Sequence, residues 1–215
     1  VIMSEYGYIP ESPAQSFGNN KGIFTPNDIY DLTRDDKFTD YGQLDLIQTQ
    51  DISGAVAQVD FTAIKSDIYN VHFLTYNNIQ IDTDANEMGI RVGFGSTPAY
   101  YTGGYEVGMQ EGNANNSWSE TRSTSMGYFR LGGDTGTGSN ECANGYVYLY
   151  NLGDSTKYSF VTQQCITWDR NPYAKSVFGS ASFQDVQSIT ALRCFITTGN
   201  LDKGNISLYG LRFYT

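Results

Sequence analysis

The sequence has one histidine, His72, among its 215 residues. Ser-His-Asp and Cys-His catalytic arrangements use histidine as the base, so any such site would depend on this residue. It lies between Val71 and Phe73 inside an apolar run, which favours a structural role. No nucleophile elbow, phosphate-binding loop, HExxH motif or dinucleotide fingerprint occurs. We therefore expect a non-enzymatic protein with no catalytic residues and no cofactor.

Basic residues are scarce, with 13 Lys and Arg against 23 Asp and Glu and a net charge of -10. Binding nucleic acid requires clustered cations to neutralise phosphates, so we expect no nucleic-acid partner. No apolar run approaches the roughly 20 residues that cross a bilayer. The opening Val-Ile-Met-Ser-Glu-Tyr lacks the basic and apolar regions of a signal peptide. Membrane insertion is therefore not expected.

Cysteine is also sparse, and the three residues Cys142, Cys165 and Cys194 form an odd set without CxxC spacing. This pattern predicts neither a zinc site nor a disulfide framework. We expect free, mostly buried thiols. Synthesis in a reducing bacterial cytoplasm fits that expectation.

Tyrosine, phenylalanine and glycine are abundant, at 17, 12 and 23 residues. Together with short alternating runs separated by turn residues, they predict an all-β fold. The chain lacks the long crossovers of parallel sheets, so an antiparallel two-sheet β-sandwich of jelly-roll or lectin-like type is expected. The predicted strands are 43–49, 56–61, 69–76, 79–82, 89–94, 105–109, 125–131, 146–151, 158–166, 174–183, 189–197 and 206–213.

The central prediction is a hairpin over residues 145–165. Tyr146, Tyr148 and Tyr150 alternate with Val147 and Leu149, so tyrosines and aliphatic residues occupy opposite faces of a strand. A turn rich in Gly, Asp and Ser leads to the second strand. Because an isolated hairpin is marginal in water, this one must belong to a larger sheet.

Residues 1–42 are predicted to be an N-terminal docking arm, and residues 43–215 the sandwich domain. The first 24 residues carry aromatic side chains in a segment too short to bury them, so another surface should cover them. Tyr6, Tyr8, Phe17 and Phe24 are the expected assembly residues.

One short helix is predicted from Pro26 to about Thr33. Thr25 suits the N-cap, Pro26 the first helical position and Asp28 the positive end of the helix dipole. The remaining acidic residues of this segment are expected in water.

Residues 95–144 contain the most glycine, asparagine and serine and are predicted to form long surface loops. Loops on a rigid sheet often carry binding surfaces. Aromatic residues among small polar ones provide contact area at low entropic cost. Tyr100, Tyr101, Tyr105 and Trp118 are therefore the predicted ligand contacts.

Two acidic patterns were considered as sites. Asp82, Asp84 and Asn86 resemble the opening of a calcium loop, but the glycine comes two residues late and no Glu closes the cage, which favours an ordinary turn and no metal. A carboxylate pair for glycoside hydrolysis requires two acids that converge in space. The sequence gives no reason to pair any of Asp60, Glu106, Glu120 and Asp169.

Four segments resemble virion structural proteins of tailed phages of marine bacteria, cyanophages especially. They are QSFGNNKGIFTPNDIYDL at residues 15–32, YGQLDLIQTQ at 41–50, NGYVYLYNLGDSTKYSF at 144–160 and GNISLYGL at 204–211. The resemblance spans nearly the whole chain. It implies a tail fibre, appendage or capsid decoration protein, and it supplies no catalytic residues.

We therefore expect a repeated subunit on the virion surface that contacts copies of itself and other virion proteins. Host surface polysaccharide or protein is the expected external partner. Two alternatives remain: a polysaccharide-degrading enzyme on the same scaffold, and a cellular carbohydrate-binding module.

Overall fold

The computed structural model describes residues 15–16, 19–20, 25–35, 44–115, 117–171 and 173–211. The chain divides into two compact units, residues 1–43 and 44–215, which are described separately. In the first unit, β1 (Gln15–Ser16) and β2 (Asn19–Asn20) pair in antiparallel fashion. Tyr6, Tyr8, Phe17 and Phe24, the predicted assembly residues, lie outside the described part of the chain.

Helix α1 (Pro26–Arg34) confirms the predicted helix and its first residue. Thr25 and Asp28 form a capping box, in which the Thr25 backbone N–H donates to the Asp28 carboxylate at 2.8 Å. The Asp28 backbone N–H donates in return to the Thr25 hydroxyl at 3.2 Å. The Thr25 hydroxyl, which donates to the Asp28 carboxylate at 2.6 Å, and the Thr25 backbone N–H together lower the pKa of Asp28. The cap explains why the helix begins here, because its first backbone donors are satisfied.

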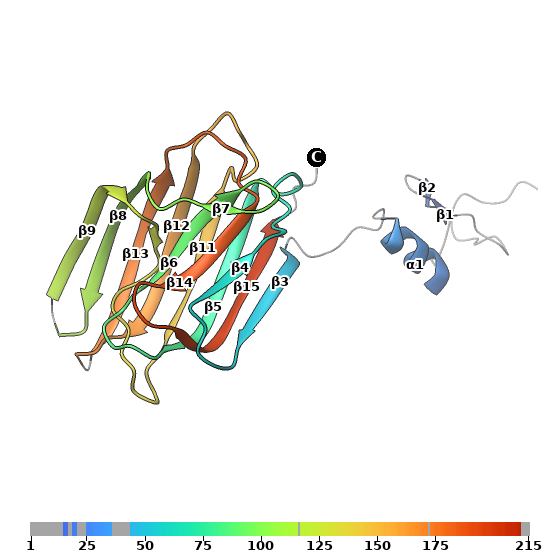
Figure 1. Cartoon of the computed structure of the whole chain (residues 1–215). Coiled ribbons are helices and arrows are strands. Elements are labelled where there is room, and N and C mark those ends of the chain that lie inside the picture. The colour runs from blue at the N-terminus through green and yellow to red at the C-terminus, as the bar shows by residue number, and fades with distance from the viewer. Residues whose placement is uncertain are drawn as a thin grey trace, which may run out of the picture. The chain divides into compact units, whose positions relative to one another are not determined.

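The second unit is an all-β sandwich of two antiparallel sheets, as predicted (Figure 1). The larger sheet has eight strands in the order β3-β15-β5-β11-β12-β13-β8-β9, and the smaller has the order β10-β6-β14-β4 with β7 added to β6. The strands are β3 (Leu44–Ile52), β4 (Gln58–Phe61), β5 (Val71–Ile81), β6 (Met88–Phe94), β7 (Ala99–Tyr100), β8 (Tyr105–Asn113), β9 (Ser117–Met126), β10 (Phe129–Arg130), β11 (Ala143–Tyr150), β12 (Ser159–Trp168), β13 (Ala174–Phe183), β14 (Ala191–Ile196) and β15 (Leu201–Leu211).

The hydrophobic core lies between the two sheets. Strand β12 alternates buried and exposed residues along its whole length, and Val147 and Leu149 of β11 are fully buried. An aromatic cluster of Tyr105, Phe129 and Phe183 closes one part of the core, with ring centroids 4.7 and 5.0 Å from that of Tyr105. The larger sheet therefore has one face in the core and one face outside it.

The predicted hairpin is confirmed as the pair β11–β12, whose register joins Tyr148 to Thr162. Two predicted strands, 69–76 and 79–82, form the single strand β5, in which Asn78 adopts a φ of 52° at an irregularity of the pairing. The predicted strand 125–131 is wrong, because β9 ends at Met126 and β10 begins at Phe129.

The larger sheet ends in β3 on one side and β9 on the other. Figure 1 shows β8 and β9 extending beyond the smaller sheet. At the opposite edge, the first residue of β3 and the last of β15 are register partners, Leu44 and Leu211. No helix among the described residues is long and apolar enough to cross a membrane.

Candidate ligand-binding face

The outer face of the larger sheet is the candidate site. Residues paired in register lie on the same face of a sheet, so the register identifies rows of side chains that cross it. One row crosses all eight strands through Leu46, Tyr209, Phe73, Tyr148, Thr162, Ser180, Gly108 and Arg122. A second row contains Tyr146, Gln164, Phe178, Gln110 and Glu120. We call this surface the aromatic face.

Aromatic rings concentrate at its centre, on β15, β5 and β11. Phe73 lies 4.7 Å from Tyr148, 5.9 Å from Tyr146 and 6.2 Å from Tyr209, measured between ring centroids. Tyr148 and Tyr150 stack with centroids 6.4 Å apart. Such contacts fix the ring positions relative to one another. The centre is therefore an ordered aromatic platform.

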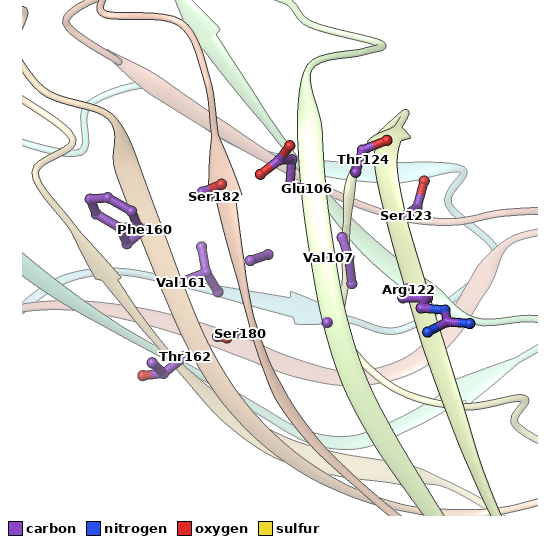
Figure 2. Close-up of a pocket in the computed structure, with 12 residues that line it drawn as sticks. Glu106, Val107, Arg122, Ser123, Thr124, Phe160, Val161, Thr162, Ser180 and Ser182 are labelled. Atoms are coloured by element: carbon purple, nitrogen blue, oxygen red, sulfur yellow. The ribbon is translucent and has the colours of Figure 1, made fainter.

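Small residues form a strip beside this platform, on β13 and β8. Gly108 and Ser180 pair in register, and Ser182 pairs with Glu106. The strip forms the floor of an open trough of about 770 Å³, with Phe160 and Thr162 on one side and Arg122 on the other (Figure 2). A second hollow of about 550 Å³ lies over Phe73, Tyr146 and Gln164. The face thus offers concave space next to exposed rings.

Charged residues in these two rows lie only at their β9 end. The two rows above carry no charged residue from β15 to β13, although the chain has a net charge of -10. Glu106 on β8 and Glu120 and Arg122 on β9 supply the charges of the trough margin. Hydroxyl and amide groups lie between the rings, and the Tyr146 hydroxyl donates to Gln164 at 2.9 Å. An uncharged, hydroxyl-rich ligand matches this chemistry.

Trp118 is the one predicted contact residue that lies on the aromatic face. Its side chain is 69% exposed, and it stands 6.5 Å from Phe178 in an edge-to-face arrangement. It belongs to β9, where a loop was predicted, so the expectation of long loops over the whole of residues 95–144 is wrong. Strands β7, β8, β9 and β10 occupy much of that segment.

Tyr105 is wrong as a surface contact, because it is fully buried. Its hydroxyl donates to the Tyr101 carbonyl at 3.1 Å and accepts from the Val92 backbone N–H at 3.0 Å. Desolvation raises the pKa of Tyr105. Aromatic identity in a glycine-rich segment did not distinguish a core position from an exposed one.

Tyr100 and Tyr101 are half-buried and hold structural contacts near the smaller sheet. The Arg193 guanidinium lies 3.8 Å from the Tyr100 ring centroid. The Tyr101 ring packs between Phe94 and Phe183, and its hydroxyl donates to Asp185 at 2.9 Å, which raises its pKa. Neither lies on the rows that define the aromatic face.

The calcium candidates Asp82, Asp84 and Asn86 form a hydrogen-bonded turn. The Asn200 backbone and side-chain N–H groups each donate to Asp82 at 2.7 Å, and these bonds lower the pKa of Asp82. Asp84 accepts from the Ala85 backbone N–H, and the Asn86 amide donates to backbone carbonyls. Among the described residues, no group of three or more His, Cys, Asp and Glu side chains could hold a metal ion.

The four carboxylates considered for hydrolysis lie in three different environments. Asp60 forms two 2.7 Å hydrogen bonds with Arg193 on the smaller sheet, and Asp169 is buried. Glu106 and Glu120 share the aromatic face. The register partner of Glu120 is Gln110, which lies four residues from Glu106 on β8, so the backbone positions of Glu106 and Glu120 are about 13 Å apart along the strands. No close pair of these four is present.

Asp169 belongs to a cluster of buried charges within the sandwich. Lys175 lies 2.6 Å from Asp169 and 3.8 Å from Glu111, and Arg130 forms ion pairs of 2.5 Å with both Glu111 and Glu87. All five side chains are at most 15% exposed. Mutual neutralisation explains how these charges can be buried, and it indicates a structural cluster.

His72 is fully buried in β5, and its Nε2 lies 2.8 Å from the Ile64 carbonyl oxygen. Since a carbonyl oxygen only accepts, Nε2 carries the proton. Desolvation lowers the pKa of His72. The residue is a neutral core histidine, which agrees with the structural role expected for it.

Comparison with protein-family models, with curated proteins and with solved structures finds no match for this chain.

Proposed function

We propose that this protein is a non-enzymatic phage virion surface protein that contacts host surface polysaccharide through its aromatic face. The observation that carries the proposal is the aromatic face itself: an ordered, uncharged platform of rings beside an open trough. Isolated exposed apolar residues are ordinary, but a contiguous exposed patch marks an interaction surface.

The chemistry of the face favours a sugar chain as ligand. The apolar C–H faces of sugar rings pack on aromatic rings, while their hydroxyl groups need hydrogen-bond donors and acceptors beside those rings. Tyr146, Gln164 and Thr162 supply such groups on neighbouring strands. The trough is open to solvent, which suits a chain that continues beyond the contacted sugars.

The assignment to a virion rests on the resemblance of four segments to virion proteins of marine tailed phages. A subunit of this kind is made in the host cytoplasm and incorporated into the particle, where it contacts copies of itself and other virion proteins. Antibodies raised against the purified protein should label the surface of intact phage particles in electron micrographs. Particles that contain none of the protein would contradict the virion assignment.

Sugar binding is tested with the whole chain and with capsular polysaccharide and lipopolysaccharide purified from marine cyanobacteria. Trp118→Ala and Tyr146→Ala should each weaken binding about fivefold or more, because an aromatic ring contributes about 1 kcal/mol or more to such contacts. Tyr30→Ala is the matched control, since Tyr30 is 67% exposed on α1 and is not one of the residues that form the aromatic face. Equal binding by all variants would refute the role of the face. Release of reducing sugar would instead favour the enzyme alternative.

A further inference from the structure

Strand β9 is an edge strand that the rest of the described structure leaves largely uncovered. It pairs with β8 on one side only, and none of its ten residues is buried. It also extends beyond the smaller sheet (Figure 1). The backbone donors and acceptors on its free side are therefore available to another strand.

Three usual protections against such pairing, namely short length, proline and lysine, are absent from β9. Natural edge strands are often short, interrupted by proline or studded with lysine. Strand β9 is 10 residues long, and its sequence SWSETRSTSM contains neither residue. Before the pairing irregularity that lies between Ser123 and Met126, its core-side positions, Ser117, Ser119, Thr121 and Ser123, all carry short hydroxyl side chains that leave room for a neighbour.

The charges on β9 specify one kind of neighbour. Glu120 and Arg122 lie two residues apart, hence on the same face, with their side chains 3.4 Å apart. In an antiparallel pair whose two-fold axis passes between the two copies of Thr121, Glu120 of each copy lies opposite Arg122 of the other. The closed interface is then self-complementary in charge, as a two-fold interface must be.

Neighbouring registers lack this complementarity. If both aromatic faces stay on the same side, the next possible registers are centred on Glu120 or on Arg122. The first places Glu120 opposite Glu120 of the other copy, and the second places Arg122 opposite Arg122. Like charges directly opposite each other destabilise a strand pair. In the register centred on Thr121, Trp118 faces Thr124, and Ser119 faces Ser123 on the other side of the sheet.

We infer that two copies of this chain associate through antiparallel pairing of their β9 strands, centred on Thr121. The pairing continues the sheet across the two-fold axis and leaves both aromatic faces on the same side. A long sugar chain could then contact both copies, which would raise its apparent affinity without any new contact. The association itself needs no ligand and does not depend on the proposed function.

The test measures the molar mass and dimer dissociation constant of the purified whole chain by sedimentation equilibrium, without polysaccharide. Glu120→Arg alone and Arg122→Glu alone each place like charges opposite one another twice, and each should weaken the dimer roughly tenfold or more. The double variant Glu120→Arg with Arg122→Glu restores opposite charges and should restore the dimer. Lys203→Glu, an exposed residue on β15 with the same charge change as Arg122→Glu, is the control.

A chain that stays monomeric at high micromolar concentration would overturn the inference. So would a dimer that both single variants leave intact, or one that the double variant fails to restore. Larger open assemblies would indicate head-to-tail pairing of β9 with β3 in its place. Because no sugar is present, each of these outcomes is separate from success or failure of polysaccharide binding.

Discussion

The indole ring of Trp118 lies over Gly112 on the neighbouring strand. A Cβ atom placed on Gly112 would come within 2.8 Å of that ring. Gly112 and Trp118 are register partners in the β8–β9 pair, so the glycine provides the space that lets the indole lie against the sheet. A highly exposed tryptophan is thereby held in one orientation on the aromatic face.

Substitution of Gly112 by alanine should displace the Trp118 ring without unfolding the sandwich. The exposed ring can swing away from the new methyl group at small cost in stability, but it then loses its position beside Phe178. We expect a shift in tryptophan fluorescence, weaker polysaccharide binding and an unfolding midpoint close to wild type. Gly103→Ala is the control, since a Cβ there meets nothing within 4 Å.

The limits of sequence-based prediction are clear at β9. Alternation of apolar and polar residues identifies a strand because one face lies in the core. Strand β9 lies largely outside the core, so both of its faces are polar apart from Trp118 and the terminal Met126, and the signal is missing. By contrast, Val147 and Leu149 alternate with three tyrosines, and the hairpin that contains them was predicted correctly.

The candidate site illustrates a second limit. The sequence places Tyr146, Tyr148 and Tyr150 on one face of their strand, but it does not show which strands lie beside them. Phe73 and Tyr209 join them only through the register of β5 and β15, which are far apart in the chain. The aromatic face is therefore a property of sheet topology, and no single segment encodes it.

Loss of Lys175 should destabilise the sandwich strongly. Lys175→Met leaves the buried carboxylates of Asp169 and Glu111 without one of their cations, which costs about 3–5 kcal/mol for a buried pair. Urea unfolding monitored by circular dichroism measures the loss. The corresponding surface substitution, Lys157→Met, removes an exposed partner of Asp154 and should cost less than about 1 kcal/mol. Equal effects at the two sites would argue that the buried cluster does not contribute to stability.

Acid should destabilise the protein partly through His72. Burial lowers the pKa of His72, so the unfolded chain binds a proton at a higher pH than the folded one. The contribution of His72 to the free energy of unfolding is complete above pH 6.5, which is about the pKa of histidine in the unfolded chain. It decreases as the pH falls below that value. The described structure offers Nδ1 no hydrogen-bond partner, so a proton bound there gains no hydrogen bond.

His72→Gln should reduce this pH dependence, because glutamine can still donate to the Ile64 carbonyl but does not titrate. The urea midpoint of the wild type should fall between pH 7 and about pH 5.5, and that of the variant should fall less. Parallel pH profiles would show that other groups account for the acid sensitivity.

The cysteines should differ sharply in reactivity. All three are free, as predicted, with Cys165 and Cys194 buried and Cys142 partly exposed. Desolvation raises the pKa of Cys165 to about 11 and raises that of Cys194 further, so neither forms the reactive thiolate readily. A thiol reagent should label one cysteine rapidly in the folded protein and all three in denaturant. Rapid labelling of a second thiol under native conditions would contradict the packing around it.

The pairing of Leu44 with Leu211 has a practical consequence for engineering. The first strand of the sandwich, β3, and the last, β15, are adjacent at one edge of the larger sheet. The chain therefore enters and leaves the sandwich at neighbouring points. Both junctions fit a single surface loop of a carrier protein, with short linkers and little distortion of either partner. The unit is thus suited to grafting as a cassette that carries its ring-bearing surface into a new protein.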